Sequence, residues 1–299
     1  MKDQARNLRK LRLEQMDNKK NQNKKLRTIT IASGKGGVGK TTLTVNLAVA
    51  LSRAGKEVMI LDADLGTANV DILFGIMPRY TLLDFIKGEK SLKEIVVKGH
   101  EGVKIIPGCS GIYEINNTSA WQREKLINDL ENYGQNMDFL LVDSGAGISK
   151  EVIGFLAAAD EVIIIVSPEP TSITDGYGII KILSRIKKHG EVNLVINRAR
   201  NLQEINETFK KLETVAARFL DIKLNRLGFI LEDRNIENAI KEMVPFCIKY
   251  PRTVGAHNLI QIAERLIADE KYWLNANSQT TEGFYSKLFN LFRNTKKRI

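Results

Sequence analysis

The sequence predicts a doubly wound α/β domain, with a mostly parallel sheet flanked by helices, and three observations support this. Short apolar runs rich in Ile and Val alternate with stretches of helical periodicity over residues 26–272. Several of these runs, among them Leu140–Val142 and Val162–Val166, are apolar at every position, as is typical of strands buried on both faces of a parallel sheet. Strands that alternate with helices at this spacing need right-handed crossovers, which place helices on both faces of the sheet.

Each element is predicted from its own pattern. The apolar runs predict strands at Thr28–Ala32, Glu57–Leu61, Val103–Ile106, Phe139–Val142, Glu161–Val166, Val192–Ile196 and Arg226–Ile230. The intervening stretches predict helices at Thr41–Arg53, Lys150–Ala158, Ile173–Lys188, Leu202–Leu220 and Asn235–Met243. The first of these helices is followed by Gly55, a residue suited to the left-handed conformation that ends many helices.

The positive charge of the chain is concentrated at its two ends. The formal net charge is +10; residues 1–27 contribute +7 and residues 282–299 contribute +4, which leaves the body between them at −1. Nucleic-acid binding needs cations on the folded surface to neutralise phosphates, so no specific nucleic-acid partner is expected. Basic tails instead favour an anionic membrane surface or a protein partner.

Composition and charge together divide the chain into three parts. We expect a basic extension with a polar linker at residues 1–25, the folded domain at residues 26–272, and a connector with a terminal helix at residues 273–299. No apolar run approaches the roughly 18 residues that a transmembrane helix needs. Cys109 and Cys247 match no metal-ligand spacing, and a cytoplasmic protein is expected.

A glycine-rich loop directly after the first strand predicts a phosphate-binding site. Glycine allows the positive φ that turns backbone N–H groups toward phosphate oxygens, and the start of the next helix adds partial positive charge. Lys40 is expected to reach the β- and γ-phosphates of ATP, and the Thr41 hydroxyl to bind Mg²⁺. The loop matches the pattern Gly, four residues, Gly-Lys-Thr, and its residues are Gly34, Lys35, Gly36, Gly37, Val38, Gly39, Lys40, Thr41 and Thr42.

Carboxylates follow two of the predicted strands. Asp62 and Asp64 end the second strand, and their spacing of two would place them on one face of an extended chain. Asp143 ends a buried strand, an arrangement that presents one carboxylate toward Mg²⁺. Gly145 and Gly147 follow, and they would let the backbone re-form around a γ-phosphate as a switch. Parallel sheets bind their ligands at the carboxyl ends of their strands, so these residues are expected to face the phosphate loop.

The loop resembles the deviant Walker A motif, KGGVGKT, of the MinD/ParA/nitrogenase-iron-protein class of P-loop NTPases, the SIMIBI class. The resemblance implies that Lys35 reaches across an ATP-bound homodimer to the phosphates of the other subunit. It also implies that Asp64 orients the attacking water, that Asp62 supports the Mg²⁺ shell and that Asn69 lies on a switch. Asn197, which ends a strand, is implied to bind the adenine edge; the alternative is an asparagine that forms a turn.

Two further features resemble the FlhG family of flagellar number and placement regulators. MinD and ParA proteins usually carry Asp-x-Pro-Ala-Gly after the fourth strand, whereas this chain has Asp-Ser-Gly-Ala-Gly, with Gly145 in place of the proline. The chain opens with the motif Asp-Gln-Ala-x-x-Leu-Arg, formed by Asp3, Gln4, Ala5, Leu8 and Arg9. The resemblance implies that this segment docks on the SRP-type GTPase FlhF and stimulates its GTP hydrolysis, and that flagellar switch-complex (C-ring) proteins are further partners.

The last segment predicts an amphipathic helix. Bulky apolar side chains fall within one arc of a helical projection and basic ones on the other side, which is typical of a helix that lies on an anionic membrane. The alternative is a terminal helix that packs on its own core; the polar connector Asn275–Glu282 favours a detachable helix. The residues expected to bind the membrane are Phe284, Lys287, Leu288, Phe289, Leu291, Phe292 and Arg293.

The sequence therefore predicts an FlhG-type ATPase that dimerises on ATP and cycles between the cytoplasm and the inner face of the cell membrane. A division-site ATPase of MinD type is one alternative, and the N-terminal extension and Gly145 argue against it. A DNA-partitioning ATPase of ParA type is a second, and the nearly neutral body argues against it. A P-loop scaffold without turnover is a third, which would be favoured if Asp64 were dispensable.

Overall fold

The computed structural model describes residues 26–64, 69–108, 119–186, 191–269 and 283–295. Side chains are described for all of these except residue 120 and residues 292–295. The predicted activator motif at Asp3, Gln4, Ala5, Leu8 and Arg9 lies outside the described residues, as do the side chains of Phe292 and Arg293.

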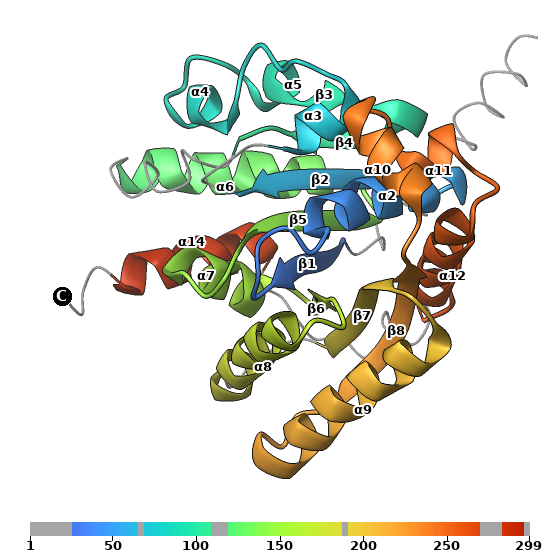
Figure 1. Cartoon of the computed structure of the whole chain (residues 1–299). Coiled ribbons are helices and arrows are strands. Elements are labelled where there is room, and N and C mark those ends of the chain that lie inside the picture. Colours follow the sequence, from blue (N-terminus) through green and yellow to red (C-terminus); the bar gives the residue numbers. More distant parts are fainter. Residues whose placement is uncertain (1–25, 65–68, 109–118, 187–190, 270–282, 296–299) are drawn as a thin grey trace, which may run out of the picture.

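A single sheet forms the centre of the molecule (Figure 1), in the order β3-β4-β2-β5-β1-β6-β7-β8. Every pair of neighbouring strands is parallel except β3 and β4. The strands are β1 Arg27–Ser33, β2 Val58–Ala63, β3 Val97–Lys98, β4 Lys104–Ile106, β5 Phe139–Ala146, β6 Glu161–Val166, β7 Glu191–Ala199 and β8 Leu224–Leu231. The predicted fold class is confirmed, and each predicted strand is present; the short edge strand β3 was not predicted.

Helices cover both faces of this sheet. On one face α2 and α12 pack against β1, β2, β5 and β8; on the other lie α6, α14, α7, α8 and α9 (Figure 1). The helices are α2 Lys40–Arg53, α3 Val70–Phe74, α4 Leu82–Ile86, α5 Leu92–Ile95, η1 His100–Gly102, α6 Ala120–Gly134, α7 Lys150–Ala158, α8 Pro170–Arg185, α9 Leu202–Phe219, α10 Arg234–Lys241, α11 Phe246–Lys249, α12 Val254–Ala268 and α14 Phe284–Thr295.

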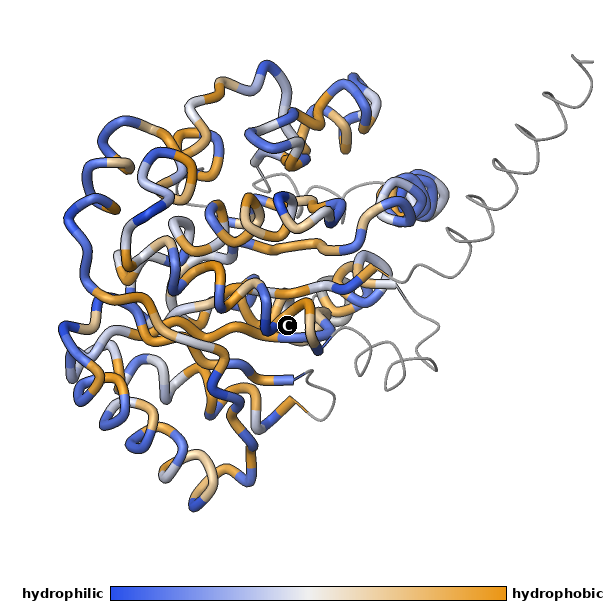
Figure 2. The backbone as a smooth tube through the Cα atoms, turned by 90° about the vertical axis from the view of Figure 1, so that its right-hand side faces the viewer, coloured by the Kyte–Doolittle hydropathy of each residue, from blue (hydrophilic) through white to orange (hydrophobic). Residues whose placement is uncertain are grey.

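The central strands are buried along their whole length, which explains their unbroken apolar runs. Every residue of β1, β2 and β6 is buried, and the middle of the molecule is accordingly orange in the hydropathy view of Figure 2. The helices alternate between blue and orange in the same view, because each turns one apolar stripe inward. The predicted helices are all present, whereas α3 to α6, α11 and α12 were not predicted.

Helix α14 packs on the body of the protein, which was the alternative to a freely detachable helix. Its buried side chains are at most 5% exposed and join the same core cluster as residues of α6 and α7. In Figure 1 the red helix lies beside green α6 and α7. These buried side chains are Phe284, Tyr285, Leu288 and Phe289.

Polar contacts hold the first turn of α14. The Ser286 hydroxyl and backbone N–H both donate to a carboxylate oxygen of Glu131 in α6, at 2.7 and 3.1 Å. The Lys287 ammonium lies 3.8 Å from the carboxylate of Asp160, just after α7. Leu291, in contrast, is 38% exposed. Three of the residues assigned to the membrane, Phe284, Leu288 and Phe289, are therefore covered by protein in this conformation. No helix among the described residues is long and apolar enough to cross a membrane.

Candidate nucleotide-binding site

The phosphate loop connects β1 to α2 at the carboxyl end of the sheet. Gly37 and Gly39 have positive φ angles of 76° and 94°, and Gly39 is the left-handed residue directly before the first turn of α2. A residue with a side chain would be strained at these φ angles. The backbone N–H groups at the start of α2 face outward and can donate hydrogen bonds to an anion.

Two glycines of the loop also allow close contacts with other elements. A Cβ atom at Gly34 would lie 2.2 Å from the carbonyl oxygen of Asp175 in α8. One at Gly39 would lie 2.4 Å from the side-chain nitrogen of Asn197 at the end of β7. The loop is thus clamped between two elements that are distant in sequence, which fixes its shape before any ligand binds.

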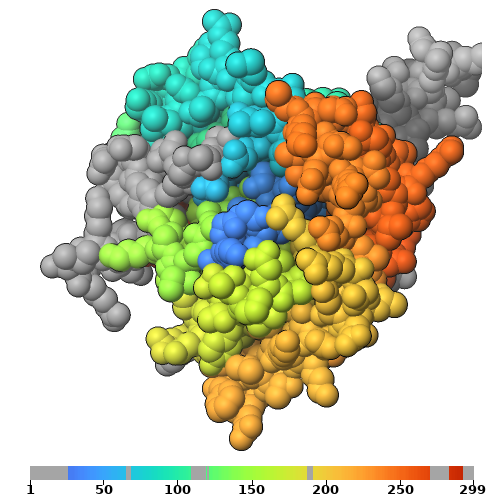
Figure 3. Space-filling view, viewed as in Figure 1, coloured from blue at the N-terminus to red at the C-terminus, as the bar shows by residue number. Residues whose placement is uncertain are grey.

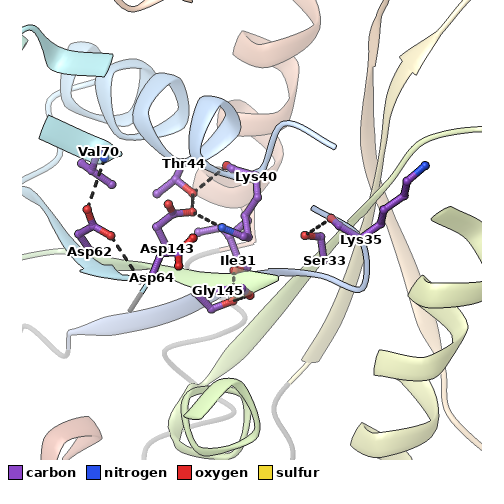
Figure 4. Close-up of polar contacts among 11 residues, drawn as sticks. Ile31, Ser33, Lys35, Lys40, Thr44, Asp62, Asp64, Val70, Asp143 and Gly145 are labelled. Carbon is purple, nitrogen blue, oxygen red and sulfur yellow. Dashed lines mark hydrogen bonds and ion pairs between the residues drawn. The ribbon is translucent and has the colours of Figure 1, made fainter. Parts of the chain in front are cut away.

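Asp143 lies at the centre of a buried polar cluster beneath the loop (Figure 4). Its side chain is fully buried, and its Oδ1 atom lies 3.4 Å from the Lys40 ammonium and 3.0 Å from the Thr44 hydroxyl. Burial raises the pKa of Asp143, and Lys40, Thr41 and Thr44 oppose this shift. Its Oδ2 atom is buried and has no hydrogen-bond partner among the described residues.

Asp62 lies beside Asp143 because the strand register puts them opposite each other in β2 and β5. Burial and the neighbouring Asp143 raise the pKa of Asp62 to about 7. The backbone N–H groups of Asp64 and Val70 donate to its two oxygens at 3.3 and 3.4 Å. Two buried carboxylates side by side repel each other, and a divalent cation would relieve that repulsion.

Asp64 follows the last residue of β2 and faces the end of β5. Its Oδ1 atom lies 3.7 Å from the Cβ position of Gly145, so the two proposed switch segments meet there. Gly147 has a φ of 86° and donates its N–H to the carbonyl of Ser33, 2.9 Å away, at the end of β1. Asn69 precedes α3 and caps it through its backbone.

Lys35 points away from the phosphate pocket of its own chain (Figure 4). Its ammonium lies 2.6 Å from a carboxylate oxygen of Glu169 and 3.1 Å from the hydroxyl of Thr171, at the start of α8. This ion pair lowers the pKa of Glu169. Lys40 instead lies inside the pocket, so the two lysines of the loop point in different directions.

A pocket beside the loop is suited to a nucleoside base. The Asn197 amide donates to the carbonyl of Val38 at 2.7 Å, which leaves its carbonyl oxygen able to accept a hydrogen bond from a base. In Figure 3 the blue surface of the loop region lies between green, yellow and orange segments. The pocket is lined by Gly39, Thr42, Leu43, Ser167, Pro168, Glu169, Asn197, Arg198, Arg200, Glu204, Ile230, Leu231, Glu232, Asp233, Ile236, Glu237, Ile240 and Phe246.

The structure thus gathers the predicted residues of the loop, Asp62, Asp64, Asp143 and Asn197 at one end of the sheet. Thr44 and Glu169, which contact predicted site residues, were not themselves predicted. Thr44 could have been found, because it lies one helical turn after Lys40 and faces the same way. Glu169 carries no such local signal, because its partner Lys35 lies 134 residues away.

No group of three or more His, Cys, Asp or Glu side chains among the described residues forms a metal site by itself. That does not conflict with a bound Mg²⁺, since this ion commonly uses one or two carboxylates together with phosphates and water. The available oxygen donors are the Oδ2 atom of Asp143, the carboxylate of Asp62 and the Thr41 hydroxyl.

Comparisons with known proteins agree with this geometry. Residues 26–197 match the family model described as an AAA domain. The antiactivator FleN of Pseudomonas aeruginosa is 39% identical over 241 residues, which cover 81% of this chain and 86% of FleN. The flagellum site-determining protein YlxH of Helicobacter pylori is 33% identical, over 87% of this chain and 88% of YlxH.

Among solved structures, the septum site-determining protein MinD from Pyrococcus horikoshii, in complex with Mg-ADP, superposes with a TM-score of 0.66. It is 25% identical, and the match covers 86% of this chain and all of that one. The sheet, the loop and the clustered carboxylates are those of an ATP-hydrolysing enzyme. The chain belongs to the FlhG family, which includes FleN and YlxH, within the MinD/ParA group of P-loop ATPases.

Proposed function

We propose that this protein is a Mg²⁺-dependent ATPase that dimerises on ATP, cycles to the membrane through α14 and regulates the number and placement of flagella. The observation that carries the proposal is a hydrolysis site whose second lysine, Lys35, lies outside its own phosphate pocket. We expect such a site to be completed by a cation from another subunit. The relatives FleN and YlxH support the flagellar role.

Within one subunit, each residue has a separate task. The loop amides and Lys40 bind the phosphates of ATP, and Lys40 exchanges its contact with Asp143 for them. The Oδ2 atom of Asp143, which has no hydrogen-bond partner among the described residues, would be available to hold Mg²⁺, and the cation would supply positive charge that neutralises the phosphates. Asp64 holds the attacking water and accepts its proton late in the reaction.

Dimerisation completes the site. An ammonium aimed at the transferred phosphoryl stabilises the charge that develops there, and it costs no rearrangement when it is already in place. Lys35 is half-exposed, and its partners among the described residues are the surface groups Glu169 and Thr171, so it could turn instead to the phosphates of a facing subunit. Hydrolysis then depends on the meeting of two subunits.

Membrane binding requires α14 to dissociate from α6 and α7. Its buried face is the same aromatic face that would enter a bilayer, so the two states exclude each other. Helix α7 follows the switch directly, since its capping residue Ser149 lies two positions after Gly147. A switch that rearranges around a γ-phosphate would move α7 and weaken the seat of α14.

The N-terminal segment is the part of the chain that we expect to bind a protein partner. We expect residues 1–17 to bind the GTPase FlhF and to stimulate its hydrolysis of GTP, with Gln4 placed to orient the water. The test is the GTP hydrolysis rate of purified FlhF with the full chain, with a chain lacking residues 1–17, and with Gln4→Ala. Stimulation only by the full chain supports the proposal. Equal stimulation by all three proteins would show that the N-terminal segment is not the activator, and stimulation by none would remove the GTPase partner. Either result leaves the ATPase assignment intact.

A further inference from the structure

Thr44 contacts the Asp143 carboxylate from below the phosphate loop. It belongs to α2, one turn after Lys40, and is fully buried. Its hydroxyl oxygen lies 3.0 Å from the Oδ1 atom of Asp143 and 3.0 Å from the backbone carbonyl of Lys40 (Figure 4). Thr44 therefore links the first turn of the helix to the end of β5.

The hydroxyl has one proton and two acceptors within reach. A hydrogen bond to a carboxylate is roughly twice as strong as one between neutral groups, so donation to Asp143 is favoured over donation to the carbonyl of Lys40. Burial excludes water as a substitute. Without the hydroxyl, the contact of Oδ1 of Asp143 with Lys40 would remain, at the longer distance of 3.4 Å.

That remaining partner is itself required elsewhere when nucleotide binds. Lys40 is expected to turn to the phosphates, and Thr44 would then be the group that still fixes Oδ1. The two oxygens of Asp143 have different surroundings: Oδ1 is held by hydrogen bonds, whereas Oδ2 has no partner among the described residues. A carboxylate held at one oxygen cannot rotate freely about its own axis, so the other oxygen keeps its direction.

We propose that Thr44 is a positioning residue for magnesium, because its hydroxyl holds Oδ1 of Asp143 and leaves Oδ2 directed to the cation that binds with the nucleotide. The inference rests on the Mg²⁺-bound nucleotide site proposed above. Thr44 is fully buried and is not among the residues that line the pocket beside the loop. Its effect passes through Asp143, as is common for groups that orient the ligands of a metal.

The test compares Thr44→Val with Thr44→Ser in the full chain. Valine keeps the branched shape without the hydroxyl, and serine keeps the hydroxyl. The measurement is the fluorescence of a labelled ADP, first in EDTA and then during titration with MgCl₂. For Thr44→Val we expect ADP affinity in EDTA within about twofold of the original chain. The Mg²⁺ concentration at half-saturation should rise about tenfold, which corresponds to about 1.4 kcal/mol; Thr44→Ser should restore it.

Thr208→Val is the matched control. Thr208 is also a buried threonine in a helix, and its hydroxyl donates to the backbone carbonyl of Glu204, four residues earlier, at 2.7 Å, rather than to a carboxylate of the proposed metal site. An unchanged Mg²⁺ midpoint in Thr44→Val overturns the proposal, as does a serine variant that folds but does not recover. If valine disturbs the packing, Thr44→Ala is the second variant without the hydroxyl. If neither hydroxyl-free variant folds while Thr208→Val does, the hydroxyl serves stability and the proposal also falls. An original chain without any response to Mg²⁺ would instead contradict the metal site itself.

Discussion

The carboxyl end of the sheet and helix α14 are both buried, but they bury opposite kinds of groups. The sheet end encloses Lys40, Asp62 and Asp143 in a region that is nearly inaccessible to water. The buried side chains in the described part of helix α14 are aromatic and aliphatic, and the helix is held at its first turn by contacts to Glu131 and Asp160. Buried charge has few alternative partners, so the first region selects a specific ligand. Apolar burial is non-directional, so the second can exchange protein for lipid.

The largest effect is expected from Asp64→Ala, which tests the charged region. The variant should bind ATP and dimerise, while the turnover rate falls by a factor of about 10²–10⁴, because a positioned base is lost. Steady-state phosphate release and sedimentation in ATP measure the two properties. Turnover at the original rate would remove Asp64 from the mechanism and favour a scaffold role for the site.

Phe289→Ala tests the apolar region. Phe289 is 2% exposed. Replacing its side chain by alanine should destabilise the packing of α14 on the body of the protein by about 3 kcal/mol, because contacts are lost and a cavity remains. Hydrogen exchange in residues 284–295 should then become faster in the nucleotide-free protein. Leu291→Ala, on the same helix but 38% exposed, is the control and should change little. Fast exchange in the original chain would show that α14 is not seated in solution.

The pH dependence of stability distinguishes the regions, because only the first contains buried carboxylates. The pKa of Asp62 is raised from 3.8 to about 7 in the folded state, so the folded protein keeps its proton at a pH where the unfolded chain has lost it. Its contribution to stability is present below about pH 4 and is lost as the pH rises through 7, a change of roughly 2–4 kcal/mol.

The measurement is the difference in unfolding free energy between the original chain and Asp62→Asn, in EDTA, from pH 4 to pH 8. Asp62→Asn should become relatively more stable as the pH rises. Saturating Mg²⁺ and ADP should remove that advantage, because the cation stabilises the ionised carboxylate. A difference in unfolding free energy that does not vary with pH would show that folding does not raise the pKa of Asp62.

The smallest effect is expected from Ser286→Ala. Its hydroxyl donates to Glu131 at 2.7 Å at a half-buried position, and the loss should weaken docking by about 1 kcal/mol without any change in charge. Binding to anionic liposomes in ADP should therefore rise up to about fivefold. Ser184→Ala, at a half-buried serine on α8 whose hydroxyl donates to the carbonyl of Lys181, should leave this binding unchanged. Unaltered binding by Ser286→Ala would show that the contact does not contribute to storage.

The same contrast explains what could be predicted from the sequence. The strands, the phosphate loop and the positions of Asp62 and Asp143 follow from local rules, since apolar runs, glycine spacing and strand ends each constrain the chain nearby. The packing of α14 on α6 and α7 does not follow from local rules, because an aromatic helix face fits protein and lipid equally well. The contact of Lys35 with Glu169 joins residues far apart in sequence, so it depends on how α8 packs against the loop.

The account predicts most directly that nucleotide state controls membrane binding through α14. Co-sedimentation with anionic liposomes measures this for the full chain and for a chain lacking residues 282–299. The full chain should bind in ATP and much less in ADP, since two helices on one dimer raise the affinity steeply. Salt should weaken binding, and the truncated chain should not bind although it still takes up nucleotide. Equal liposome binding in ATP and in ADP would contradict this account. It would also be contradicted if the full chain did not bind liposomes and residues 26–281 bound DNA tightly in ATP.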